Sequence, residues 1–160
     1  MNDEIIKLLV ERYFNNERAS DWAIKCLEKG HDSRSLRMLA SMSDSFTSPF
    51  ELDEYYQRSL KELGWDKVNS EEYLMRYAKI LAEEIVEDKT DPIQSSQNIY
   101  SILIDLEYPS ELSAWFDINE MIWDYNYFLK TGKDDSYWFR PKEKLISIIK
   151  KASKELLNSK

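Results

Sequence analysis

Apolar side chains recur every three or four residues along most of the chain, which is the spacing of an amphipathic helix. The most regular stripe lies between residues 70 and 86 and holds Leu74, Tyr77, Ala78, Leu81, Ala82 and Ile85. Strict alternation of apolar and polar residues, the pattern of a half-buried strand, appears nowhere over a useful length. The sequence therefore predicts an all-α protein of about eight helices, arranged as an irregular bundle or a short array of stacked helix pairs.

Short polar signals predict where these helices begin and end. Gly30 and Gly64 each follow a helical stripe and suit the left-handed position after a helix. Ser48-Pro49 and Asp91-Pro92 each place proline after a capping residue, which is typical of a helix start. Asn15-Asn16 is expected to end the first helix. No stretch reads as an interior linker, so we expect a single domain over residues 1–160.

Composition narrows the class of protein further. The chain has 160 residues, of which 42% are hydrophobic and 13% aromatic, enough to bury a core. Its one cysteine, Cys26, excludes internal disulfides and multi-cysteine zinc sites. No uninterrupted apolar run exceeds three residues, so no membrane span is expected. The N-terminal residues read as a helix start and not as a signal peptide, which predicts a cytoplasmic protein.

Charge is distributed unevenly along the chain, whose net charge is −8. Residues 71–124 hold thirteen acidic residues against three basic ones, a local charge of −10. Residues 140–160 hold seven basic residues against two acidic ones, a local charge of +5. An acidic surface repels nucleic acid and attracts basic partners. For this reason we do not interpret the helix pair around Gly30 as a DNA-binding helix-turn-helix, although Arg34 and Arg37 lie on its second helix.

Two residues of the stretch Asp21–Ala40 are the obvious candidates for catalysis. His31 is the only histidine, and one histidine beside Asp32 falls short of the three or four ligands of a metal site. Cys26 lies on the apolar face of its helix and reads as a buried small hydrophobic residue. We predict that the chain binds no cofactor and is not an enzyme. The alternative is a hydrolase-type enzyme that uses His31 or buried carboxylates.

The carboxylates and aromatic residues of the second half form the predicted partner-binding surface. Glu83, Glu84, Glu87 and Asp88 make two i,i+4 pairs on one helix. The segment Trp115–Phe139 is rich in aromatic residues, which are typical of binding hot spots. Packing of the last helix against the preceding one would also use these residues, and this is the favoured alternative. Its helical spacing predicts a core-facing stripe of Trp115, Phe116, Ile122 and Trp123, and exposure of Tyr127, Tyr137 and Trp138. The predicted partner-binding residues are Glu83, Glu84, Glu87, Asp88, Asp117, Glu120, Asp124, Tyr127 and Trp138.

The first 65 residues also resemble small uncharacterised bacterial helical proteins. The resemblance rests on Trp22-Ala23, Leu27, Gly30, Asp32-Ser33, Leu36-Arg37 and Leu39-Ala40, the pattern WA…L..G.DS..LR.LA, followed by Glu62-Leu63-Gly64. It implies an all-helical fold and no particular activity. By analogy of type, small acidic helical proteins of this kind are similar to immunity proteins of bacterial toxin systems.

These observations favour a non-enzymatic protein-binding module whose acidic surface docks a basic protein, in its most specific form an immunity protein that neutralises a toxin. Nucleic acid and membrane are not expected as partners. An adaptor or a homodimer built on the aromatic segment is the alternative.

Overall fold

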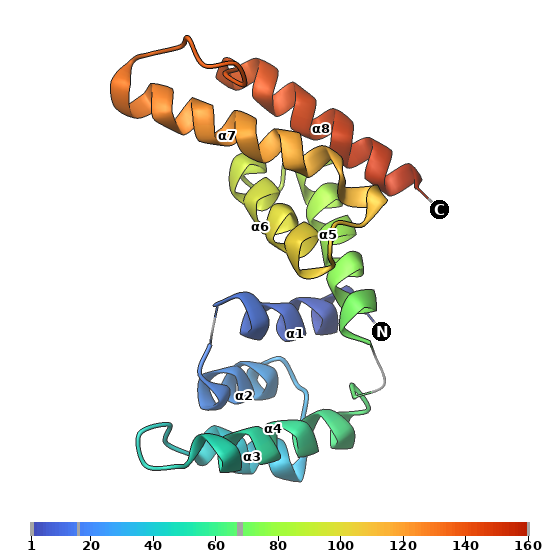
Figure 1. Cartoon of the computed structure of the whole chain (residues 1–160). Coiled ribbons are helices and arrows are strands. Elements are labelled where there is room, and N and C mark those ends of the chain that lie inside the picture. Colours follow the sequence, from blue (N-terminus) through green and yellow to red (C-terminus); the bar gives the residue numbers. More distant parts are fainter. Residues whose placement is uncertain (1, 16, 67–68, 160) are drawn as a thin grey trace. The chain divides into compact units, whose positions relative to one another are not determined.

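The computed structural model describes residues 2–15, 17–66 and 69–159, and every regular element in these ranges is helical (Figure 1). The elements are α1 (Asp3–Asn15), α2 (Ala19–Glu28), α3 (Arg34–Ser41), α4 (Pro49–Leu63), α5 (Ser70–Val86), α6 (Pro92–Asp105), the 3-10 turn η1 (Ser110–Leu112), α7 (Ala114–Thr131) and α8 (Lys142–Asn158). Eight α-helices over the described residues confirm the predicted all-α fold class. Asn16, expected to help end the first helix, lies outside the described residues.

The chain divides into two compact units between Tyr73 and Leu74, a position inside α5. The first unit contains α1 to α4, and the second contains α6 to α8 with most of α5. Because the helical stripe of α5 continues through this position, the sequence carries no linker signal there. The single domain over residues 1–160 stays a prediction.

The core of the first unit is built around Trp22 of α2, whose side chain is fully buried. Its indole Nε1 donates a 2.9 Å hydrogen bond to the carbonyl oxygen of Leu8 in α1. The rings of Tyr56 and Trp65 meet the indole edge-on, with centroids 4.9 and 6.3 Å away. A buried N–H without an acceptor costs about 1–3 kcal/mol, so this bond fixes where α2 lies against α1. The remaining buried members of the cluster are Leu9, Ala19, Ala23, Cys26, Leu36 and Leu39.

Glu62, near the end of α4, caps the N-terminus of α3. Its carboxylate accepts hydrogen bonds from the hydroxyl of Ser35 at 2.6 Å and from the backbone N–H of Ser35 at 2.9 Å. These two bonds hold the pKa of Glu62 below its ordinary value, because they favour the ionised form. The bond from the Ser35 hydroxyl has the larger effect. Ser33 is the N-cap of α3 and accepts from the backbone N–H of Leu36 at 3.2 Å. Two side chains therefore satisfy the first turn of α3, and one of them ties it to α4.

Four helices of the described residues end in the same left-handed turn. At the ends of α2, α4, α5 and α6, a residue with positive φ precedes an N–H that bonds to the carbonyl five residues earlier. Gly30 and Gly64 occupy this position as predicted, but Asp88 (φ 56°) and Glu107 (φ 55°) occupy it in the other two helices. A side chain in this conformation costs on the order of 1 kcal/mol. The C-terminal ends of α5 and α6 therefore carry backbone strain.

The second unit has an apolar core to which each of its helices contributes. α7 and α8 run antiparallel and are joined by the loop between Gly132 and Pro141 (Figure 1). α6 packs against both of these helices. The fully buried large side chains of the unit are Ile85, Ile99, Ile102, Leu103, Leu112, Trp115, Ile118, Ile122, Leu145 and Ile149. The predicted start signal of α6 is confirmed, since Asp91 accepts from the N–H groups of Ile93 and Gln94 at 2.8 and 3.1 Å.

Replacing Glu107 with glycine should stabilise the protein by about 0.5–1 kcal/mol, because glycine removes the left-handed strain and Glu107 is exposed. Gly64→Ala is the matched control in the opposite direction. A Cβ at Gly64 meets nothing within 4 Å, so only backbone strain lowers the stability of that variant. Denaturant unfolding followed by circular dichroism measures both changes. A Glu107→Gly variant that is less stable than the wild type would contradict this account.

The hydrogen bonds between Glu62 and Ser35 should stabilise the protein only while Glu62 is ionised. Since the folded pKa of Glu62 is lowered, its contribution is fully present above the unfolded pKa of about 4.3 and is lost as the pH falls through the folded value. A double-mutant cycle of Glu62→Gln and Ser35→Ala should give a coupling energy at pH 7 that vanishes at low pH. A coupling energy that is equal at pH 7 and pH 2.5 would show that the charge is not involved.

Candidate functional site

α7 carries aromatic side chains on two opposite faces. One face is buried and holds Trp115, Ile118, Ile122 and Tyr125. The other face is exposed: Phe116 is 48%, Trp123 73% and Tyr127 43% accessible. Residues alternately four and three positions apart share one side of a helix, so Glu120 and Lys130 belong to the same exposed row. We name this row the outer stripe: Phe116, Glu120, Trp123, Tyr127 and Lys130.

The prediction that Phe116 and Trp123 face the core is wrong, whereas the same prediction is confirmed for Trp115 and Ile122. Adjacent helical residues point about 100° apart, so Phe116 and Trp123 lie one step further round the helix than the buried pair. α6 and α8 cover one side of α7, and that side ends before the outer stripe. The exposed tryptophan is therefore the surface feature that the sequence prediction missed.

A shallow hollow opens beside the outer stripe. It has a volume of about 220 Å³ and is lined by Gln97 of α6 together with Trp123, Asn126, Tyr127 and Lys130 of α7. Pockets for small-molecule ligands usually measure about 300–1,000 Å³, so this hollow better suits one protruding side chain of another protein. A second hollow of about 430 Å³ shares Gln97 and Asn126 and continues to the start of α6. Trp123 and Tyr127 thus stand at the edge of a grooved surface.

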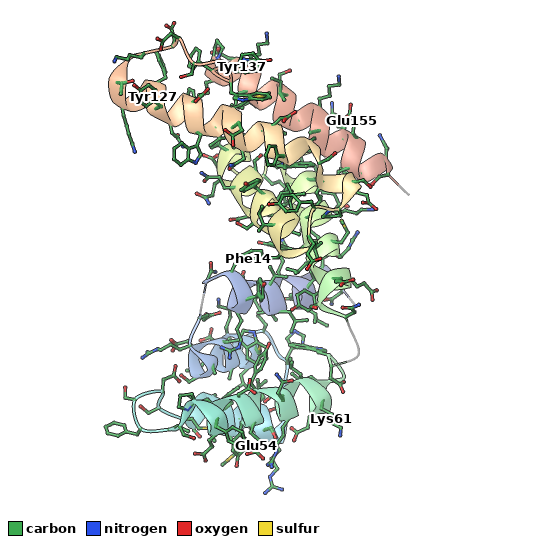
Figure 2. The ribbon with its side chains drawn as sticks, in the orientation of Figure 1. Phe14, Glu54, Lys61, Tyr127, Tyr137 and Glu155 are labelled. Carbon is green, nitrogen blue, oxygen red and sulfur yellow. The ribbon has the colours of Figure 1, made fainter. Side chains whose placement is uncertain are left out.

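The loop between α7 and α8 is attached to the flank of α7. The backbone N–H of Trp138 donates a 3.0 Å hydrogen bond to Asp124 Oδ2, and the rings of Phe128 and Phe139 lie 4.9 Å apart. Figure 2 shows Tyr127 near the C-terminal end of α7 and Tyr137 in this loop. Tyr137 is exposed, as predicted, but Trp138, which was also predicted to be exposed, is half-buried. Asp124 therefore has a structural role, which the sequence did not indicate.

Two of the four predicted carboxylates at the end of α5 form ion pairs within the chain. Asp88 pairs with Lys150 of α8 at 2.6 Å, and Glu87 pairs with the neighbouring Lys89. Glu83 and Glu84 are half-buried. The acidic middle and the basic tail of the sequence therefore meet at Asp88 and Lys150. Complementary charge in two distant segments was the signal that would have suggested this pairing.

The stretch of sequence that contains the outer stripe is acidic. Between Asp91 and Thr131 the chain holds seven carboxylates and a single basic residue, Lys130. On α7 itself, Asp117 is exposed and Glu120 is half-buried. Asp117, Glu120 and Tyr127 thus lie on the same helix as an exposed tryptophan, a residue type that is enriched in protein-binding hot spots.

Of the candidate catalytic residues, Cys26 lies in the core of the first unit, whereas His31 is half-buried. Burial, above all, raises the pKa of the Cys26 thiol to about 12, which makes it a poor nucleophile at neutral pH. The ring of His31 packs edge-on against Trp65 with centroids 4.9 Å apart. Across residues 2–15, 17–66 and 69–159, no three His, Cys, Asp or Glu side chains are grouped to hold a metal ion. Arg37 was considered above for DNA contacts, and its Nε lies 3.5 Å from Asp32 Oδ1.

Asp124→Ala should release the loop that carries Trp138, because the amide of Trp138 loses its acceptor. A hydrogen bond to a charged group is worth about 1.5–3 kcal/mol, so amide exchange at Trp138 should accelerate by at least about tenfold. Hydrogen exchange measured by NMR checks this, with Asp117→Ala on the same helix as the matched control. Unchanged protection at Trp138 would show that the loop is held by its aromatic contacts alone.

A search for similar proteins found no matching protein-family model, curated protein or solved structure. Among the helices of the described part of the chain, none is long and apolar enough to cross a membrane. The resemblance to small bacterial helical proteins stays a prediction. The interpretation of α7 therefore rests on its own residues.

Proposed function

We propose that this protein is a non-enzymatic protein-binding module and that the outer stripe of α7 docks a partner with a basic surface. The observation that supports this most directly is Trp123, which is 73% exposed on a helix whose opposite face is already buried. Trp, Tyr and Phe side chains contribute large binding energies at low entropic cost. On the same face, Tyr127 lies one turn after Trp123 and Phe116 lies two turns before it, and both are exposed.

Charge supports the choice of a basic partner. The seven carboxylates between Asp91 and Thr131 give this stretch a net charge of −6. Such a field speeds the approach of a cationic protein and disfavours acidic ones. In this proposal, Trp123 supplies the anchor at the centre, and Asp117 and Glu120 contact cationic side chains at the rim. The carboxylates at the end of α5 contribute less, because Glu87 and Asp88 already have cationic neighbours.

The most specific form of the proposal is a cytoplasmic immunity protein that neutralises a basic toxin. A neutralising protein needs fast capture and a large apolar anchor, and no catalytic group of its own. Fast capture would come from the acidic field and slow release from the desolvated aromatic contact. This form rests on the analogy of type together with the charge of the α6–α7 stretch.

Trp123→Ser should weaken partner binding by about 2 kcal/mol or more, roughly thirty-fold in Kd, because it removes the central anchor. Affinity capture from cells of the source organism, followed by binding kinetics with the purified partner, measures the change. Tyr137→Ser is the matched control, since Tyr137 is also an exposed aromatic residue but lies in the loop outside the outer stripe. Asp117→Lys should lower the association rate more than it raises the dissociation rate.

The salt dependence separates this proposal from simple apolar association. The association rate of the wild type should fall as the salt concentration rises, because the steering field is screened over about 10 Å at 0.1 M. A captured partner that is acidic, or one whose binding survives Trp123→Ser, would overturn the proposal.

A further inference from the structure

The outer stripe has the spacing of a coiled-coil seam. Its five members, defined above, follow one another at intervals of four, three, four and three residues. Apolar side chains at this spacing can interlock with those of a second helix, and Phe116, Trp123 and Tyr127 are the apolar members of the stripe. We propose that two copies of this protein pair through their outer stripes in an antiparallel arrangement, and that a basic partner competes with this dimer. The competition rests on the proposed function, whereas the dimer does not.

The stripe is complementary to itself in one antiparallel register. When Trp123 lies opposite Tyr127 of the second copy, Glu120 lies opposite Lys130 of the second copy. Two-fold symmetry repeats each contact, so the interface contains two aromatic pairs flanked by two ion pairs. Lys130 is the single basic residue between Asp91 and Thr131, and it stands where the second copy presents a carboxylate.

The register shifted by one heptad is less favourable. It sets Trp123 opposite Glu120 of the second copy and places Phe116 opposite Tyr127. Lys130 would then lie beyond the first residue of the second α7, which begins at Ala114. The carboxylate of Glu120 would be desolvated against an indole without a cationic partner, which is costly. Charge therefore selects the first register.

The size of the surface predicts a weak dimer. The contact is centred on one helix from each copy, and each large aromatic residue contributes up to about 150–250 Å². Such an interface falls below the standard size of about 1,200–2,000 Å², which is typical of reversible association. Trp123 would thus be covered in the dimer but still open to displacement by a partner that binds more tightly.

Sedimentation equilibrium of the full chain from about 1 µM to about 1 mM tests the dimer, since this range spans the Kd expected for a small interface. We expect reversible monomer–dimer association. Glu120→Lys and Lys130→Glu should each raise the dimer Kd by at least about tenfold, because each places like charges opposite one another twice. The double variant, Glu120→Lys with Lys130→Glu, should restore association. Trp123→Ser should weaken the dimer, and Tyr137→Ser should not.

A chain that stays monomeric over the whole range would overturn the proposal. So would a dimer that tolerates Trp123→Ser, or a charge-swapped double variant that fails to recover. Adding the purified basic partner should yield complexes with one copy of this chain, and complexes with two copies would overturn the competition. Failure to find any basic partner would count against the proposed function and leave the dimer measurement unaffected.

Discussion

The left-handed helix end is the constraint on which much of this structure depends. Each such end turns the chain sharply and delivers the next residue back onto its own helix. His31 follows the end of α2 and Trp65 follows the end of α4, and the two rings meet at 4.9 Å. Trp65 in turn packs against Trp22, whose indole bonds to α1. The ends of α2 and α4 thus bring His31 and Trp65 together beside the core of the first unit.

Local signals predicted most of the helix boundaries, because a helix end is decided by a few neighbouring residues. Ser48 and Asp91 cap the helices that they were expected to cap, and Gly30 and Gly64 adopt positive φ. The bond from Ser35 to Glu62 joins residues 27 positions apart and has no local signal. The left-handed Glu107 was also missed, because a glutamate tolerates that conformation only when the surrounding structure imposes it.

The candidate site was predicted in part, for a reason that lies in the composition of α7. Tyr127 and Tyr137 are exposed as expected, but Phe116 and Trp123 are exposed against expectation. When apolar residues occur all round a helix, the sequence predicts burial without saying which face is covered. Only the packing of α6 and α8 settles that choice. The net charge of the segment also did not indicate which carboxylates are engaged within the chain. Asp88 pairs with Lys150, and Asp124 accepts a hydrogen bond from the loop between α7 and α8.

The two proposals for α7 share Trp123 and Glu120 and differ in the role of Asp117. The dimer would cover the aromatic centre and pair Glu120 with Lys130, whereas Asp117 lies about 120° round the helix from Trp123 and would keep facing solvent. A basic partner could therefore be attracted by the dimer before it displaces the second copy. Weak self-association then lowers the apparent affinity for the basic partner in proportion to the fraction of copies whose stripe is covered. It does not slow electrostatic capture of that partner. A surface that is both aromatic and acidic can in this way stay protected from indiscriminate apolar contacts and still be reached quickly by the partner that its charge selects.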